Sequence, residues 1–319
     1  MLIVSAGGTT GWRASAAELE RAFVTAGAAV RRVDAGPVPE VPTFMLTDFA
    51  QALAASRACR RAIVQRDPGA IVYCSITAAL LWPRPGAIWL DAIAAENRPG
   101  RHGIWQRAVE RRRLAAAPLV MTMAPYRLPA TRTAAIVVPT AVQRSGPTDG
   151  ARDVDVLAYA ADPVKRRLDL ILDAWARARR AGETLVVAGI ERSEPVAGVR
   201  FAGRLAPDEY RALLRRSRVF VSAPRREDFG IAALEALADG CRLVTTPSPG
   251  PYPALALARE LDPRLVADDL AGALRCALDD PRPGYAERAA ALIAPFSRAA
   301  VAATVSERVL PRLLPGWSA

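Results

Sequence analysis

Residues 222–240 read SAPRREDFGIAALEALADG, and this stretch passes from the end of one element into the body of the next. The apolar run 219–221 before it is typical of a buried strand, and the charged turn 225–228 follows. Gly230 then opens a stretch of helix-forming residues that ends near Gly240. A strand, a turn and a helix in this order form part of a parallel α/β unit, whose ligands bind at the carboxyl ends of the strands.

The same alternation extends along the chain on both sides of this stretch. We expect strands at 2–6, 29–33, 70–74, 87–90, 119–121, 135–138, 154–159, 184–188, 199–201, 219–222 and 242–245. Helices are expected between them at 14–26, 50–65, 103–116, 168–181, 208–216 and 231–239, and after them at 268–279, 284–294 and 298–314. Continuous apolar strands that alternate with helices predict parallel sheets covered on both faces.

The turn-forming stretch 143–150 divides this pattern and predicts a linker. The fold class is therefore α/β, with two Rossmann-like domains whose parallel sheets face each other across a cleft. We assign 1–145 to a first domain, 146–297 to a second domain, and 298–319 to a last helix that crosses back to the first domain.

Composition limits the class of protein. The 319 residues carry a net charge of +11 and the sequence pI is about 10.4, which suits anionic partners or, equally, a basic solvated surface. Four scattered cysteines form no C-x-x-C pair, so a zinc site or a disulfide framework is not expected, and a reduced compartment fits. The chain opens on a strand rather than a signal peptide, and apolar runs such as 114–123 are shorter than the roughly 20 residues of a membrane span.

Two carboxylates flank the helix start at Gly230. Glu227 lies in the turn and Glu235 on the helix, and both can accept hydrogen bonds from a polyol, while the free amides at the helix start favour anions or hydroxyls. From the residues alone the alternative stays open that Glu235 is solvated and Glu227 only complements the helix dipole.

The wider pattern resembles a known family. Glu227, Phe229 and Gly230 followed by Leu234-Glu235-Ala236 resemble the signature of retaining glycosyltransferases of family 4. Upstream, 162–165 (DPVK) resembles a lysine segment that binds the donor diphosphate, and 199–203 (VRFAG) and 240–244 (GCRLV) resemble neighbouring turns. The likeness is strong over 154–246 and weak over 1–145, and it implies the GT-B fold, with the donor nucleotide on the second domain and the acceptor on the first.

This resemblance implies a role for each matching position. Lys165 would neutralise the leaving diphosphate, Glu235 would bind the ribose, Glu227 would contact the transferred sugar, and the amides of Phe229, Gly230 and Ile231 would hold sugar or phosphate. Gly8, in the glycine loop 7–11 after the first strand, would face the reacting centre. The donor would be a sugar linked to UDP or GDP, with no further cofactor and no metal.

The sequence departs from the family pattern at two places. Relatives carry a Gly-Arg pair about six residues before the lysine, where Ala158-Tyr159 stand here, and Arg204, Arg225 or Arg226 are candidates for the missing charge. Relatives also carry a histidine after the strand equivalent to 87–90. Asp91 stands there, either as an acceptor-orienting group and weak base or as a turn residue, and the single histidine, His102, lies in a loop further on.

Three other patterns have simpler interpretations than a binding site. The glycine loop lacks G-x-G-x-x-G spacing, which disfavours a nicotinamide site, and Asp153-Val154-Asp155 is expected to be structural rather than a metal motif. The basic helix within 101–114 predicts either a solvated arginine face or peripheral contact with an acidic membrane. Nucleic-acid binding is not expected, because no aromatic platform accompanies the arginines.

The sequence therefore predicts a cytoplasmic glycosyltransferase, with a peripheral position at the inner membrane face as an open alternative. Its acceptor would be a hydroxyl of a glycan, a lipid or a small molecule. The competing functions are a non-catalytic nucleotide-sugar binder and an epimerase or phosphorylase of the same fold.

Overall fold

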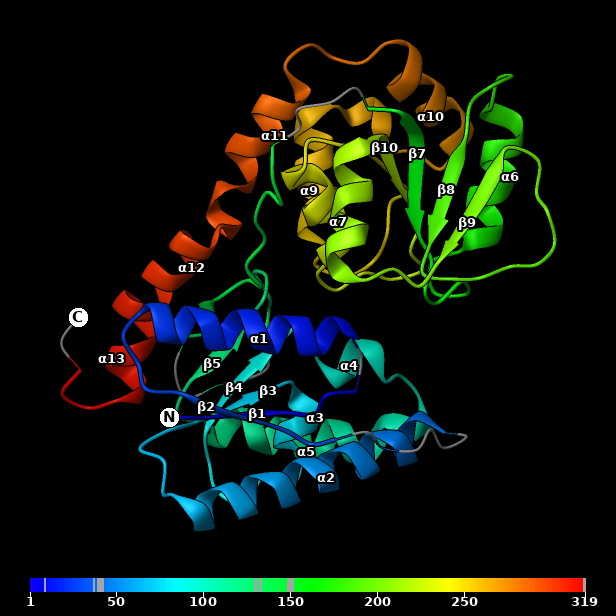
Figure 1. Ribbon diagram of the computed structural model, residues 1–319. Helices are drawn as coiled ribbons and strands as arrows, with labels where there is room; N and C mark the ends of the chain where they lie inside the picture. Colours follow the sequence, from blue (N-terminus) through cyan, green and yellow to red (C-terminus); the bar gives the residue numbers. More distant parts are fainter. Residues whose placement is uncertain are drawn as a thin grey trace. The chain divides into compact units, whose positions relative to one another are not determined.

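The computed structural model describes residues 1–8, 10–36, 38, 43–128, 131, 134–147 and 152–317. The chain forms two compact units (Figure 1). The first comprises residues 1–141 together with 296–319, and the second comprises residues 142–295. Parts of the expected glycine loop (Thr9) and linker (148–150) lie outside the described residues, as does the side chain of His102.

The first unit is built on a six-stranded parallel sheet. Its strands, in the order β2-β1-β3-β4-β5-β6, are Arg31–Asp34, Leu2–Ser5, Ile71–Cys74, Ala87–Leu90, Val120–Thr122 and Ile136–Val137. Every residue of β1, β3 and β4 is buried, which explains why these strands read as unbroken apolar runs.

Helices cover both faces of this sheet. Helix α1 (Thr10–Thr25) lies on one face, and α2 (Phe44–Gln65) and α5 (Ile104–Ala116) lie on the other (Figure 1). The short helices α3 (Ile76–Ala79) and α4 (Ala94–Asn97), which the sequence analysis did not predict, follow β3 and β4. Helix α1 begins at Thr10, so Thr10 and Gly11 belong to the helix and not to the loop.

The end of the chain packs on the first unit. Helix α12 (Arg298–Thr304), a π-helical turn (Val305–Val309) and α13 (Leu310–Leu313) follow one another, and α12 contacts α1. Arg298 donates two hydrogen bonds to the Glu18 carboxylate, of 2.7 and 2.8 Å. These contacts attach the last helices to α1.

One helical segment among the described residues, Tyr285–Leu313, is long and apolar enough to cross a membrane by length and composition alone. The sequence analysis expected no such segment. One such helix is weak evidence for a span, and 22% of its apolar window is buried.

The second unit is built on a five-stranded parallel sheet. Its strands, in the order β11-β10-β7-β8-β9, are Arg242–Thr245, Ser217–Ser222, Val154–Tyr159, Leu185–Ala188 and Val199–Gly203. The helices are α6 (Leu168–Ala178), α7 (Pro207–Arg216), α8 (Ile231–Ala238), α9 (Pro253–Leu261), α10 (Leu270–Asp279) and α11 (Tyr285–Ile293). The sequence analysis missed α9, which starts with proline directly after a proline-rich loop.

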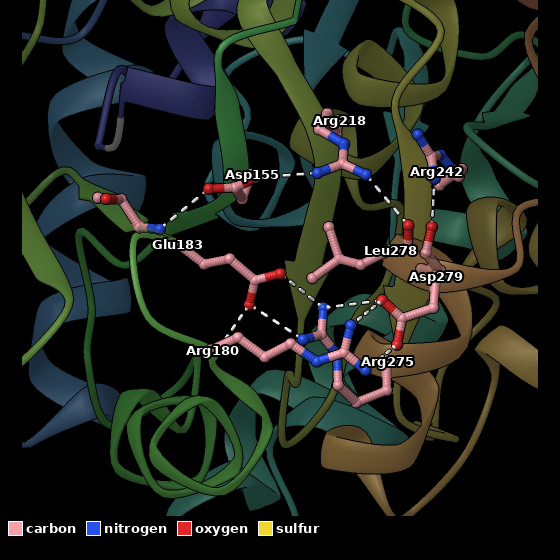
Figure 2. Close-up of polar contacts among 10 residues, drawn as sticks. Asp155, Arg180, Glu183, Arg218, Arg242, Arg275, Leu278 and Asp279 are labelled. Carbon is pink, nitrogen blue, oxygen red and sulfur yellow. Dashed lines mark hydrogen bonds and ion pairs between the residues drawn. The ribbon is translucent and has the colours of Figure 1, made fainter.

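An ion-pair network joins the sheet of this unit to α10 (Figure 2). Glu183 accepts hydrogen bonds of 2.9 and 3.0 Å from Arg275 of α10 and one of 2.7 Å from the Arg180 amide. Asp155 accepts from Arg218 and from the Thr184 amide, both at 3.0 Å. Some of the many arginines of this chain therefore form ion pairs that stabilise the second unit.

Both aspartates of the Asp-x-Asp motif pair with arginines. Asp153 is paired with Arg216, and Asp155 is a member of the network near the amino ends of the strands. Ligands of parallel sheets bind at the opposite, carboxyl ends.

We predict that Glu183→Ala destabilises the second unit by about 1–3 kcal/mol, because it leaves the largely buried Arg275 guanidinium without its main partner. Urea unfolding followed by circular dichroism measures this loss. The matched control is Glu194→Ala, which removes an exposed pair with Arg192 and is expected to cost well under about 1 kcal/mol. Equal losses in the two variants would contradict a stabilising role for the network.

Candidate functional site

The turn between β7 and α6 carries Lys165. The Asp162 carboxylate accepts a 2.9 Å hydrogen bond from the Lys165 amide, which closes the turn, and the lysine side chain is exposed. The next residue but one, Arg167, donates to the Ala223 carbonyl at 2.7 Å and to the Thr246 hydroxyl at 2.6 Å. Because Ala223 and Thr246 follow β10 and β11, the turn is fixed across the carboxyl ends of these strands.

The loop with Glu227 is bonded directly to this turn. The Arg225 amide donates to the Lys165 carbonyl at 2.9 Å, and the Arg225 side chain donates to the Val164 carbonyl at 3.0 Å, so the two loops are held side by side. Arg166, directly after the lysine, forms an ion pair with the Glu227 carboxylate, which is 6% exposed. The structure therefore brings together Lys165 and Glu227, which lie far apart in the sequence.

The start of α8 completes this part of the site. Gly230 has φ +82°, and a Cβ there would lie 2.7 Å from the Tyr252 ring, so a side chain is excluded both by conformation and by space. Phe229 is buried, and the amides of Ile231 and Ala232, at the first positions of the helix, have no intrahelical partner. These amides and the helix dipole favour an anionic or hydroxyl ligand beside Glu227.

Charges in the loop are balanced around Asp228. Arg226 donates a 2.7 Å hydrogen bond to its carboxylate. Burial raises the pKa of Asp228, and the positive charges of Arg226 and Lys165 oppose this shift.

Glu235 lies on α8 and is held by the neighbouring helix α7. Arg211 contacts the Glu235 carboxylate at 3.0 Å, and the Glu235 side chain is 26% exposed. The adjacent Tyr210 is half-buried, and its ring lies 5.5 Å from that of Tyr159. Its hydroxyl oxygen is buried and has no hydrogen-bond partner among the described residues. Burial, and then the charge of Glu235, raise the pKa of Tyr210 well above its usual value.

The structure also locates the three arginines proposed to replace the missing one. Arg225 donates to the Val164 carbonyl and Arg226 pairs with Asp228, whereas Arg204 is exposed after β9 and has no ion-pair partner among the described residues. The sequence analysis missed Arg166, which reaches Glu227. Its only sequence signal is the basic run 165–167 directly before α6.

The first unit places the other two predicted residues at one edge of its sheet. Gly8 follows β1 and is exposed, and Asp91 follows β4 and is half-buried with a polar partner. Between these strands lies β3, which Ser75 follows directly. Because all three strands are parallel, Gly8, Ser75 and Asp91 share the carboxyl edge.

Backbone strain marks the same edges. Among the described residues, three residues other than glycine have positive φ: Ser75 (115°), Arg167 (47°) and Tyr252 (29°). They follow β3, β7 and β11, at the carboxyl ends of the strands. Such strain costs about 1–3 kcal/mol per residue and clusters at functional sites. The described residues contain no group of three or more His, Cys, Asp or Glu side chains that could hold a metal ion.

Part of the second unit matches a known protein family. Residues 155–280 match the family model described as Glycosyl transferases group 1. No curated protein matches the chain in sequence.

Solved structures match over nearly the whole chain. WaaG, a glycosyltransferase involved in lipopolysaccharide biosynthesis, has a TM-score of 0.72 at 14% identity, covering 99% of this chain and 100% of WaaG. Sucrose-phosphate synthase from Thermosynechococcus elongatus has a TM-score of 0.66 at 15% identity, covering 96% of each chain. HepE from Anabaena, in complex with UDP and glucose, has a TM-score of 0.66 at 15% identity, covering 96% of this chain and 97% of HepE.

Two parallel α/β units with these matches define the GT-B fold, which confirms the predicted fold class. The family match lies within the second unit, and the solved structures show the fold of the whole chain.

Proposed function

We propose that this protein is a retaining glycosyltransferase of family 4 that moves a sugar from a nucleoside diphosphate to an acceptor hydroxyl. In this reaction the bond between the anomeric carbon and the diphosphate oxygen breaks and a bond to the acceptor oxygen forms. The acceptor proton passes to the leaving diphosphate. The observation that carries the proposal is the connection of the Lys165 turn, Glu227 and the start of α8 at the carboxyl edge of the second sheet.

Each group at this edge has a role that suits its chemistry. Lys165 and the amides of Phe229, Gly230 and Ile231 stabilise the negative charge that develops on the diphosphate. Glu227 accepts hydrogen bonds from the sugar, and its ion pair with Arg166 holds it in place. Glu235 accepts hydrogen bonds from the ribose, and Arg204 is a further phosphate contact.

The first unit supplies the acceptor side of the proposed reaction. Gly8 allows close approach to the backbone, and Asp91 orients the acceptor hydroxyl. The neutralising charge comes from Lys165 and the helix start, so the proposed reaction needs neither a metal ion nor a further cofactor. We propose a cytoplasmic location, with a peripheral position at the inner membrane face as the alternative.

A second candidate is a nucleotide-sugar binder without turnover. It is favoured by Tyr159, which stands where relatives carry the diphosphate arginine and packs against Tyr210 instead. An epimerase or phosphorylase of the same fold is less favoured, because the chain has one histidine in total.

A thermal-shift panel tests the donor site. We expect one of UDP, GDP, ADP or TDP to raise the melting temperature equally with and without magnesium, because a ligand at 100 times its dissociation constant adds about 2.7 kcal/mol to stability. UDP is the first choice, since HepE was solved with UDP and glucose. The absence of any shift would overturn the donor site. The matching nucleotide sugar then distinguishes an enzyme, which turns over and gives a product with retained anomeric configuration, from a binder.

A further inference from the structure

A cavity lies wholly within the first unit, whereas the donor groups described above belong to the second. It has a volume of about 480 Å³ and lies between the segment after β4, helix α5 and the segment after β5. Most of its wall is apolar, formed by Ile93, Ala95, Ile104, Ala108 and Leu128. Such a volume accommodates a short alkyl chain or a ring.

Three arginines line the same cavity. Arg107 donates to the Arg98 carbonyl at 2.5 Å, whereas Arg111 and Arg127 are exposed, and none of the three has an ion pair with a carboxylate among the described residues. Many other arginines of this chain are paired, as Arg275 is with Glu183. The three guanidinium groups outnumber the single carboxylate that lines the cavity, so its net charge is positive and favours an anion.

The acid that lines the cavity, Glu110, has no ion pair with these arginines among the described residues. Glu110 is 2% exposed, and its Oε2 accepts a 2.8 Å hydrogen bond from the Ala94 amide. Burial raises the pKa of Glu110 to about 7, against the opposing effect of this hydrogen bond. Glu110 instead fixes the turn Ile93–Ala94, which begins two residues after Asp91.

The apolar surface continues outside the cavity. Ile104, on its wall, is 58% exposed, and the next residue, Trp105, packs edge-on against Phe49 at 6.1 Å between ring centroids. Phe49 is itself 47% exposed. An amphiphile can therefore extend from the cavity along this surface.

We propose that this cavity binds an amphipathic anion, with its apolar part against Ile93, Ile104 and Leu128 and its anionic group on Arg107, Arg111 and Arg127. The cavity adjoins the segment that carries Asp91, so we assign the ligand to the acceptor. This assignment rests on the proposed function, whereas the binding of the anion does not. The acceptor class is then an apolar chain or ring that bears a phosphate or carboxylate.

Octyl phosphate, used below its micelle concentration with the full-length protein, is the probe. We expect calorimetry to show that it binds at least about tenfold more tightly than octan-1-ol, which lacks the anionic group, or inorganic phosphate, which lacks the alkyl chain. Arg111→Gln should weaken binding of octyl phosphate about three- to tenfold, and Ala108→Trp, which fills the cavity, should abolish it. Arg112→Gln is the matched control, since Arg112 is exposed on the same helix but does not line the cavity.

The outcomes separate the possibilities. Equal binding of octyl phosphate by wild type, Arg111→Gln and Arg112→Gln, or no binding at all, would overturn the proposal even if Ala108→Trp fails to fold. Vesicles of phosphatidylglycerol distinguish the source of the ligand: loss of vesicle binding in the Ala108→Trp variant indicates a membrane lipid, and unchanged vesicle binding indicates a free amphiphile. No nucleotide is present in these measurements, so their failure and the failure of the donor site are distinguishable.

Discussion

Glu227→Gln is expected to lower the turnover of the donor sugar by about 10²-fold or more, while the binding of the nucleoside diphosphate changes little. The Glu227 carboxylate is almost fully buried, is paired with Arg166, and lies in the loop bonded to the Lys165 turn. Glutamine keeps the size of the side chain and removes the charge, so the loss measures the carboxylate and not the space that it fills.

Initial-rate kinetics with the donor identified by the thermal-shift panel measure this loss, and the melting temperature with the diphosphate alone measures binding. Glu194→Gln is the matched control, because this exposed carboxylate pairs with Arg192 in the loop between β8 and β9, away from Glu227 in the sequence. A turnover within about threefold of wild type would remove Glu227 from the reaction. A loss of diphosphate binding in parallel with turnover would instead indicate that the loop has moved, which unfolding of the unliganded variant can reveal.

The sequence predicts the sheets of this fold well, because parallel strands buried on both faces appear as short apolar runs. The runs at 70–74 and 87–90 coincide with β3 and β4 within one residue, for example. The helix start at Gly230 was equally visible, since the turn, the glycine and the following apolar residues are adjacent in the chain. Features that local sequence determines were therefore found.

Features that depend on contacts between distant residues were not. Arg166 and Glu227 are 61 residues apart, and neither has a local pattern that marks it as a pair. Glu110 lies among arginines on a helix and was treated as part of a basic stretch, yet it is buried and its carboxylate accepts from the Ala94 amide. Helix α9 is a local feature that the sequence conceals for a different reason, because the three prolines at 247–251 directly before it are typical of a loop.

Lys165→Gln is expected to weaken nucleoside diphosphate binding by about 10- to 100-fold, because a charged hydrogen bond to phosphate contributes roughly 1.5–3 kcal/mol. The side chain is exposed at the turn between β7 and α6, and the Lys165 carbonyl accepts a hydrogen bond from Arg225 in the neighbouring loop. Titration with the diphosphate and with the parent nucleoside measures the change. The affinity for the nucleoside, which has no phosphate, should stay within about twofold of wild type, and an equal loss for both ligands would show that the turn and not the charge was altered.

A chemical experiment tests the same side chain without a substitution, because Lys165 is the only lysine in the chain. Acetylation of amines in the wild-type protein removes the charge of this one side chain and modifies the amino terminus, which donates to the Ala29 carbonyl. We expect the modified protein to lose its binding of the diphosphate. We also expect that diphosphate bound before the reaction protects Lys165 from the reagent. The Lys165→Arg variant keeps a positive charge that the reagent does not modify, so its residual binding should survive the same treatment. If acetylated wild type binds the diphosphate as before, the positive charge at the donor site comes from the arginines around Lys165, with Arg166 the first to be tested.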